Sequence, residues 1–264
     1  MKILSIGNSF STDAQRWLHG ISLAEGGEEI ECVNLYIGGC SLLRHHKNLV
    51  ENRCDYDYER NGIHTIVKVS LEEVLSSGVY HAVTFQQTSR TSGITRSYFP
   101  YITDLDRYVR EKQPHARRLF HQTWAYEIDS THRAFEYYAH NTDEMTRRII
   151  DSTETVAFLL DQELIRCGEF IDYLRKNISV FDYRNGGLSL NRDGYHLTKN
   201  YGRFAVGAMW YASLTGNCPV NAEGFIDFAL KNGDENVSFE LEKVEIILSA
   251  LREFLSLEER EMPR

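Results

Sequence analysis

Short apolar runs of strand length alternate along most of the chain with segments whose apolar residues recur at helical spacing. This regular alternation predicts an α/β protein, a three-layer α/β/α sandwich with helices on both faces of the sheet. We expect the sheet to be five-stranded and mostly parallel. The predicted core strands are residues 2–6, 30–37, 79–85, 117–123 and 155–160.

Capping residues bound the helices between these strands. Thr12 and Asp13 are good caps for a helix over residues 13–25. Ser70 and Glu73 have the spacing of a capping box. Residues 52–70 end in a run of period two, which predicts a strand or hairpin inserted into the alternating scheme. The other helices of the core are expected at 41–50, 98–113, 143–151, 161–177 and 199–214.

Residues 1–215 carry this alternation and are predicted to form one α/β domain. Residues 216–264 are expected to form a helical extension packed on the same domain, with helices near 221–231 and 239–257. Apolar residues recur at helical spacing in the last helix, which predicts docking onto the domain or a homodimer contact. These residues are Leu241, Val244, Leu248, Leu251 and Leu255.

The first strand runs directly into Gly7-Asn8-Ser9, a turn that leads into the first predicted helix. Open α/β sheets bind their ligands at the carboxyl ends of parallel strands, so Ser9 stands where a reacting group is expected. A serine hydroxyl becomes a good nucleophile only when a base takes its proton. Ser9 is therefore a candidate nucleophile, and the alternative is an ordinary turn or capping serine.

A base is available near the other end of the chain. Asp193 and His196 are three residues apart on a predicted loop just before the last core helix. At this spacing the aspartate can orient the imidazole and stabilise the imidazolium that forms during catalysis. Ser9, His196 and Asp193 are therefore the predicted catalytic residues, although a D-x-x-H pair alone is unspecific.

Taken in chain order, Gly7-Asn8-Ser9, Gly38-Gly39, Gln86-Gln87 and Asp193-x-x-His196 resemble the sequence blocks of the SGNH hydrolases, also called GDSL-like esterases and lipases. The resemblance covers residues 1 to about 215. The phrase Gly7-Asn8-Ser9-Phe10-Ser11 is similar to an uncharacterised bacterial branch of this superfamily. The resemblance implies a flavodoxin-like sandwich and ester hydrolysis through an acyl-serine intermediate.

The resemblance also implies an oxyanion hole made by the N–H groups of Ser9 and Gly39 and by an amide side chain. The family's usual asparagine of the third block is missing, so Gln86 or Gln87 is expected to replace it. Gln86 is favoured because sugar-ester members of the family often carry a glutamine directly after the apolar part of that strand. Asn8 stands where the family usually has aspartate, and it should leave the turn intact.

The loops after the third and fourth predicted strands are rich in hydroxyl, amide and aromatic groups, which suits a polyhydroxylated substrate but is also common in solvated loops. Arg90 and Arg96 are either contacts for an anionic group or plain surface arginines. Trp124 and Tyr126 are either a platform for a sugar ring or core anchors. The predicted substrate-binding residues are Asn8, Arg90, Trp124 and Tyr126.

Composition and charge narrow the classes of function. The 264 residues are 42% hydrophobic and 25% charged, as in an ordinary globular protein. The net charge of -9 and the lack of a long basic run argue against nucleic acid binding. Five cysteines without a C-x-x-C pair indicate neither a disulfide framework nor a zinc site, and the proposed chemistry needs no cofactor.

No apolar run has the length of a membrane span, and the first strand is too short for the core of a signal peptide. A cytoplasmic protein is expected, although a secreted protein whose signal had been removed would look the same.

The sequence thus predicts a serine esterase acting on short acyl esters, in particular acetyl groups on a carbohydrate or another small molecule. One alternative is an SGNH scaffold that has lost efficient turnover and binds a glycan or a small metabolite. Another alternative is a lipase or thioesterase for longer acyl chains. Few apolar stretches lie beside the loops, which argues against this alternative.

Overall fold

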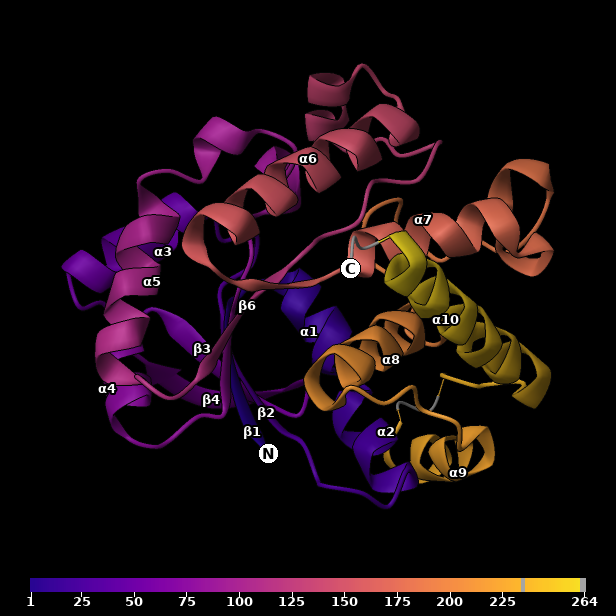
Figure 1. Cartoon of the computed structure of the whole chain (residues 1–264), viewed down its shortest axis with the longest axis horizontal. Helices are drawn as coiled ribbons and strands as arrows, with labels where there is room; N and C mark the ends of the chain where they lie inside the picture. Colours follow the sequence, from indigo (N-terminus) through magenta and orange to yellow (C-terminus); the bar gives the residue numbers. More distant parts are fainter. Residues whose placement is uncertain (234–235, 262–264) are drawn as a thin grey trace.

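A seven-stranded sheet with helices on both faces forms the centre of the protein in a computed structural model, which describes residues 1–233 and 236–261 (Figure 1). The strands are β1 (Lys2–Gly7), β2 (Glu31–Tyr36), β3 (Tyr56–Arg60), β4 (Ile63–Val69), β5 (Ala82–Phe85), β6 (Arg117–His121) and β7 (Glu163–Ile165). Their order across the sheet is β4-β3-β2-β1-β5-β6-β7. The strands β2, β1, β5, β6 and β7 run parallel, and β3 and β4 extend the sheet as an antiparallel hairpin.

The predicted sandwich is confirmed, but the sheet has seven strands rather than five. The hairpin expected within residues 52–70 supplies the two extra strands. The prediction of a strand at 155–160 is wrong, because this segment is the end of helix α6 (Thr142–Leu160) and the fifth parallel strand is β7. Phe158 and Leu159 are 86% and 59% exposed, as on the outer side of an amphipathic helix.

Helices cover both faces of the sheet (Figure 1). One face carries α3 (Leu42–Val50), α4 (Leu71–Ser76) and α5 (Tyr101–Lys112), and the other carries α1 (Ser9–Gln15), α2 (Leu18–Ala24), α7 (Cys167–Asn177) and α8 (Tyr201–Thr215). Neighbouring strand residues point to opposite layers, so that Ile3 packs with the second group of helices and Leu4 with the first. The sheet is therefore buried on both sides.

The C-terminal helices α9 (Ala222–Asn232) and α10 (Leu241–Glu261) lie outside α2 and α8 (Figure 1). Val244, Leu248 and Leu251 of α10 are buried in the same apolar cluster as the inner side of α8. Leu241 is 37% exposed at the start of the helix. The apolar side of α10 is thus used in packing against the α/β core.

The first helix begins at Ser9 rather than at residue 13. Asn8 is its N-cap, and the chain turns at Arg16 and Trp17 before α2 begins. Asp13 lies inside α1 and is fully buried, so its predicted role as a cap is wrong. Starting the helix directly after β1 brings Ser9 to the carboxyl edge of the sheet, where the loops after β2, β5 and β6 also lie.

Candidate active site

Ser9 is held in place by the turn between β1 and α1. Asn8 has an extended backbone (φ -148°, ψ -158°), and its side chain accepts a hydrogen bond from the Phe10 N–H at 3.0 Å. Ser11 completes a capping box, because its Oγ accepts the Asn8 N–H at 3.0 Å. Ser9 is the first residue of the helix, so its own N–H has no partner within the helix.

Gly7 is required by the close packing of this turn. A Cβ at Gly7 would lie 2.0 Å from the Oγ of Ser11 and 2.6 Å from the Oδ1 of Asn34. Both side chains belong to a buried hydrogen-bond network, and Ser11 donates to Asn34 at 2.9 Å. A side chain at Gly7 would therefore displace the residues that fix the start of α1.

His196 and Asp193 meet Ser9 from a loop almost at the other end of the chain. The Nε2 of His196 lies 2.9 Å from the Oγ of Ser9, and its Nδ1 lies 2.7 Å from the Oδ2 of Asp193. The other carboxylate oxygen of Asp193 accepts the backbone N–H groups of His196 at 2.7 Å and Tyr195 at 3.2 Å. The structure thus brings together the three residues predicted from the sequence to be catalytic.

The contacts of Asp193 and His196 determine which of their atoms carry protons. Burial raises the pKa of Asp193, but the hydrogen bonds and charge of His196 outweigh this effect and hold the pKa below its ordinary value. Asp193 is therefore a carboxylate at neutral pH and only accepts hydrogen bonds. Its contact places the imidazole proton on Nδ1 and leaves Nε2 free to accept the proton of Ser9.

The segment 189–197, called here the Asp193 loop, is anchored by a buried aspartate of α1. Asp13 is 1% exposed and accepts the Leu197 N–H at 3.0 Å. The same carboxylate receives the Nε of Arg203 at 2.7 Å and the Nη1 of Arg192 at 3.2 Å. This contact ties the loop that carries His196 to the helix that carries Ser9.

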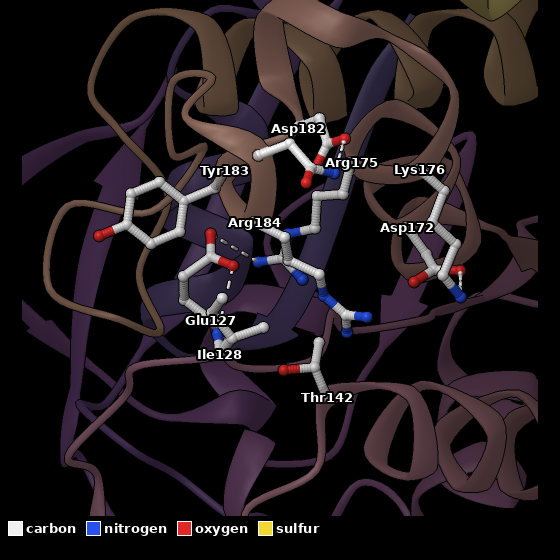
Figure 2. Close-up of a pocket in the computed structure, with 10 residues that line it drawn as sticks. Glu127, Ile128, Thr142, Asp172, Arg175, Lys176, Asp182, Tyr183 and Arg184 are labelled. Carbon is white, nitrogen blue, oxygen red and sulfur yellow. Dashed lines mark hydrogen bonds and ion pairs between the residues drawn. The ribbon is translucent and has the colours of Figure 1, made fainter.

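The other side of the Asp193 loop rests on Glu127 and Arg175, which Figure 2 shows turned toward one another. The Glu127 carboxylate lies 3.7 Å from Arg175 and accepts the hydroxyl of Ser189 at 2.7 Å. The Glu127 N–H donates to the carbonyl oxygen of Gly194 at 2.8 Å, and Arg175 donates to the side chain of Asn191. Burial lowers the pKa of Arg175, and the Glu127 carboxylate opposes that effect.

Ser9 and His196 border a cavity of about 370 Å³. Its wall is completed by the end of β2 and the following turn to Gly39, by residues 88–90, and by His132 and Tyr195. Gly39 has a positive φ of 61°, which glycine adopts without strain, and a Cβ there would meet no atom within 4 Å. The Gly39 N–H makes no backbone hydrogen bond within the described chain, so it is available to a ligand.

Asn8 joins three loops at the floor of this cavity. Its Nδ2 donates to the carbonyl oxygen of Cys40 at 3.0 Å, which ties the Ser9 turn to the turn that contains Gly39. Its Oδ1 accepts the Nε2 of Gln86 at 2.5 Å, which ties it to the end of β5. The predicted contact of Asn8 with substrate remains a prediction, and its contacts within the protein give it a clear positioning role.

The two glutamines considered for the oxyanion hole have different environments, and neither is among the residues that line the cavity. Gln87 donates to the carbonyl oxygen and the hydroxyl of Ser97 at 3.0 and 3.1 Å, so both of its amide protons are used. Gln86 donates one amide proton to Asn8 and contacts the Nδ1 of His121 at 3.0 Å. The geometry therefore disfavours Gln87, and Gln86 is the glutamine directly linked to the Ser9 turn.

The prediction that Trp124 and Tyr126 form a platform for a sugar is wrong, because both side chains are fully buried. Trp124 stacks on Phe10 with 4.2 Å between ring centroids, and its Nε1 donates to the Tyr195 carbonyl oxygen at 2.8 Å. The Tyr126 hydroxyl lies 3.0 Å from the Oγ of Ser89. Both rings support the residues that line the cavity from behind. Arg90, in contrast, is exposed and lines the cavity, and its contact with substrate remains a prediction.

Sequence reasoning missed His132, which lies in the segment between β6 and α6. That segment contains the short 3-10 helix η3 (Arg133–Tyr138), and the Nδ1 of His132 accepts the Ala134 N–H at 3.1 Å. The neutral ring therefore carries its proton on Nε2. Burial lowers the pKa of His132, and the charges of His196 and Arg90 lower it further. His132 adds a neutral hydrogen-bond donor to the cavity wall, and no sequence signal marked it.

The sandwich described above is the fold of the SGNH hydrolases, as comparison with two solved structures shows. A protein from Slackia heliotrinireducens, described as a "putative SGNH hydrolase", has a TM-score of 0.55 at 17% identity, with 81% of this chain and 98% of that chain covered. A lipase/acylhydrolase from Enterococcus faecalis has a TM-score of 0.51 at 12% identity, with 81% and 95% covered. At such identities the likeness concerns the fold.

The chain belongs to the DUF4886 family, described as a domain of unknown function, whose profile matches residues 2–237. The crystal structure of a DUF4886 family protein from Bacteroides uniformis has a TM-score of 0.82 at 30% identity, with 97% of this chain and 95% of that chain covered. Among proteins with curated descriptions, none matches the sequence. No helix within the described residues is both long and apolar enough to cross a membrane.

Proposed function

We propose that the protein is a serine ester hydrolase that works through an acyl-enzyme. The observation that carries this proposal is the continuous hydrogen-bonded set from Ser9 through His196 to Asp193, with contacts of 2.9 and 2.7 Å. It lies at the edge of an open cavity and therefore has access to a substrate. A nucleophile, a base and an orienting carboxylate in contact form the arrangement that acyl transfer requires.

In the proposed reaction, the Ser9 Oγ attacks the ester carbonyl carbon while His196 takes the hydroxyl proton. The negative charge that develops on the carbonyl oxygen is stabilised by the N–H groups of Ser9 and Gly39. When the intermediate collapses, the bond to the alcohol breaks and His196 gives its proton to the leaving oxygen. Water, activated by His196, then hydrolyses the acyl-serine by the same steps. Asp193 keeps the imidazole in the required tautomer throughout.

The proposed substrates are short acyl esters, in particular acetyl esters of a carbohydrate or another small molecule. The cavity beside Ser9 has a volume of about 370 Å³, which suits a small acyl group rather than a long chain. Tyr36, Thr88 and Ser89, three residues that carry hydroxyl groups, line its wall and favour a polar alcohol. The alternative of a catalytically weak binding module shares these features and differs only in turnover.

Hydrolysis of p-nitrophenyl acetate by the parent and by Ser9→Ala tests the proposal. Ser256→Ala is a matched control, because this exposed serine lies on α10 away from the cavity. We expect Ser9→Ala to lose at least about 10³-fold in kcat and the control to match the parent. A fluorophosphonate should label the parent and the control but not Ser9→Ala. Equal hydrolysis by the parent and Ser9→Ala would exclude the enzyme and leave the binding module.

One observation favours longer acyl chains as a second candidate. A larger cavity of about 750 Å³ lies beside the Gly39 and Thr88 loops, and its wall includes apolar side chains. These are Leu43, Ile94, Phe99, Tyr101 and Tyr137. The ratio of kcat/KM for p-nitrophenyl octanoate to that for the acetate separates the candidates. A ratio above one in the parent, together with a lower ratio in Leu43→Glu, would favour the longer acyl chain.

A further inference from the structure

Most basic side chains of this acidic protein are paired with carboxylates. Arg117 pairs with Glu163, and Arg147 pairs with both Glu144 and Asp151. Such pairing is expected for a chain with a net charge of -9. An arginine that has no carboxylate partner is therefore informative, particularly when it borders a cavity.

Three arginines that line the Ser9 cavity or the cavities next along the surface make no ion pair within the described part of the chain. They are Arg90 in η1 (Ser89–Thr91), Arg96 in η2 (Thr95–Ser97) and Arg133 in η3. All three are exposed. The other basic side chains of the described residues that lack a carboxylate partner lie on exposed helix faces, and these are Arg44, Lys47, Lys231 and Arg252.

The three arginines are linked by one aromatic residue. Arg90 and Arg133 line a cavity of about 260 Å³ together with His132 and Tyr137. Arg96 and Tyr137 line the neighbouring cavity of about 750 Å³. The Nη2 of Arg90 donates to the Tyr137 hydroxyl at 2.9 Å, and its guanidinium lies 5.6 Å from the Tyr137 ring centroid. Arg90 and His132 also line the Ser9 cavity, so the 260 Å³ cavity adjoins the Ser9 cavity on one side and the 750 Å³ cavity on the other.

The charges that face this region leave a positive excess. Glu136 is the carboxylate that lines the 260 Å³ cavity, where it stands against two guanidinium groups. Asp193, near the Ser9 cavity, is already paired with His196 at 2.7 Å. His132 is neutral at neutral pH because its pKa is lowered. An incoming anion would therefore meet more positive than negative charge beside the reacting serine.

We propose that Arg90, Arg133 and Arg96 bind an anionic group of the substrate, so that the preferred ester carries a carboxylate, sulfate or sulfonate, or phosphate near the scissile bond. Arg90 is the central residue because it borders both the Ser9 cavity and the adjoining 260 Å³ cavity. Planar guanidinium groups match the oxygens of such anions geometrically. This proposal rests on the proposed ester hydrolysis and names its substrate class.

Matched pairs of anionic and neutral esters test the proposal. For charge on the alcohol, 4-acetoxybenzoate and 4-acetoxybenzenesulfonate are each compared with methyl 4-acetoxybenzoate. For charge on the acyl group, the phenyl monoester of glutaric acid is compared with phenyl pentanoate. The measured quantity is the selectivity, defined as kcat/KM for the anionic ester divided by kcat/KM for its neutral partner. Leaving-group effects cancel when the selectivity of a variant is divided by that of the parent.

We expect the selectivity of Arg90→Gln to be about tenfold lower than that of the parent for at least one substrate pair. This factor is typical of one charge-assisted hydrogen bond. The loss should be larger in the triple variant Arg90→Gln, Arg96→Gln, Arg133→Gln. Arg90→Lys keeps the charge and should retain most of the selectivity. Arg252→Gln, an unpaired arginine on α10, is the control and should equal the parent. Raising the salt concentration should reduce the parent's selectivity, because exposed charges are screened.

Equal selectivity of the triple variant and Arg252→Gln for every pair would overturn this proposal. That failure is distinct from failure of the esterase proposal, in which Ser9→Ala would hydrolyse the neutral esters as fast as the parent. If hydrolysis depends on Ser9 and selectivity does not depend on the arginines, the esterase stands and the anionic substrate class falls.

Discussion

Replacing Asp13 by asparagine should destabilise the protein and slow its chemistry together. Asp13 is 1% exposed and receives Arg192, Arg203 and the Leu197 N–H. Asparagine has nearly the same shape but lacks the charge, and only one of its two terminal atoms accepts hydrogen bonds, so at least one of these donors loses its acceptor. Removing one member of a buried ion pair costs about 3 to 5 kcal/mol. The lower value applies here, since the Arg192 side chain is 31% exposed and partly solvated.

A loss of about 3 kcal/mol lowers the urea midpoint by about 1 M for a denaturant slope near 3 kcal/mol per M. The kcat for p-nitrophenyl acetate should fall about tenfold or more, because small displacements of a catalytic group are costly. Asp143→Asn is the matched control. Asp143 also contacts two basic side chains, Lys176 and Arg184, but it is 47% exposed, so the change should cost at most about 1 kcal/mol.

Two results would refute this reasoning. If Asp13→Asn and Asp143→Asn have the same urea midpoint, the buried carboxylate does not stabilise the fold as its contacts suggest. If Asp13→Asn is less stable but keeps the parent's kcat at a temperature where both are folded, the anchor does not position the Asp193 loop. The two measurements separate stability from positioning.

Three further outcomes follow from the described contacts. Burial lowers the pKa values of His45 and His121 to about 3, whereas in the unfolded chain both side chains have a pKa near 6.5. The unfolded state therefore binds more protons than the folded state below pH 6.5, so the stability present above pH 6.5 is lost as the pH falls toward 3. The free energy of unfolding measured in urea should therefore be lower at pH 5 than at pH 7 by roughly 2 kcal/mol for each histidine. In His121→Gln this difference should shrink by the contribution of one histidine. Asp193→Asn should lower kcat by about 10⁴-fold without loss of fold by circular dichroism, because an amide does not hold the imidazole in the required tautomer. Gln87→Ala should lower the free energy of unfolding in urea by about 1 to 3 kcal/mol with little change in kcat. Gln86→Ala should lower kcat about tenfold or more. A larger loss of kcat in Gln87→Ala than in Gln86→Ala would instead indicate that Gln87 is the oxyanion donor.

The sequence predicted the parts of the fold that depend on local signals. Alternating apolar runs predicted four of the five parallel strands and the hairpin, because each of these strands is specified within a few residues. The segment 155–160 was mistaken for a strand because an apolar run of that length is compatible with either a strand or a helix. The structure shows that Val156 is buried while Phe158 is exposed, a division that depends on which neighbours α6 packs against.

Within the site, the order of the motifs was sufficient to predict that Ser9, Asp193 and His196 lie together. The remaining contacts depend on residues far apart in the chain, which no local pattern marks. Asp13 meets Leu197, a partner that lies 184 residues away. The burial of Trp124 likewise depends on Phe10, against which its ring stacks. An aromatic residue after a strand has the same sequence context whether it lines a cavity or packs beneath the residues that line it.

Asn8 and Gln86, the two residues that depart from the sequence blocks this chain resembles, form one hydrogen-bonded unit. The Nδ2 of Asn8 donates to the Cys40 carbonyl oxygen, and an aspartate at this position would place an unpaired carboxylate oxygen against that carbonyl in a buried site. The Oδ1 of Asn8 is met by the longer side chain of Gln86, whose own oxygen contacts the Nδ1 of His121. The amide at position 8 therefore suits both neighbours, because it offers a donor to one and an acceptor to the other. A change at either position alone would leave a buried polar group without its partner, so the Asn8 and Gln86 side chains act as one unit in the turn that holds Ser9.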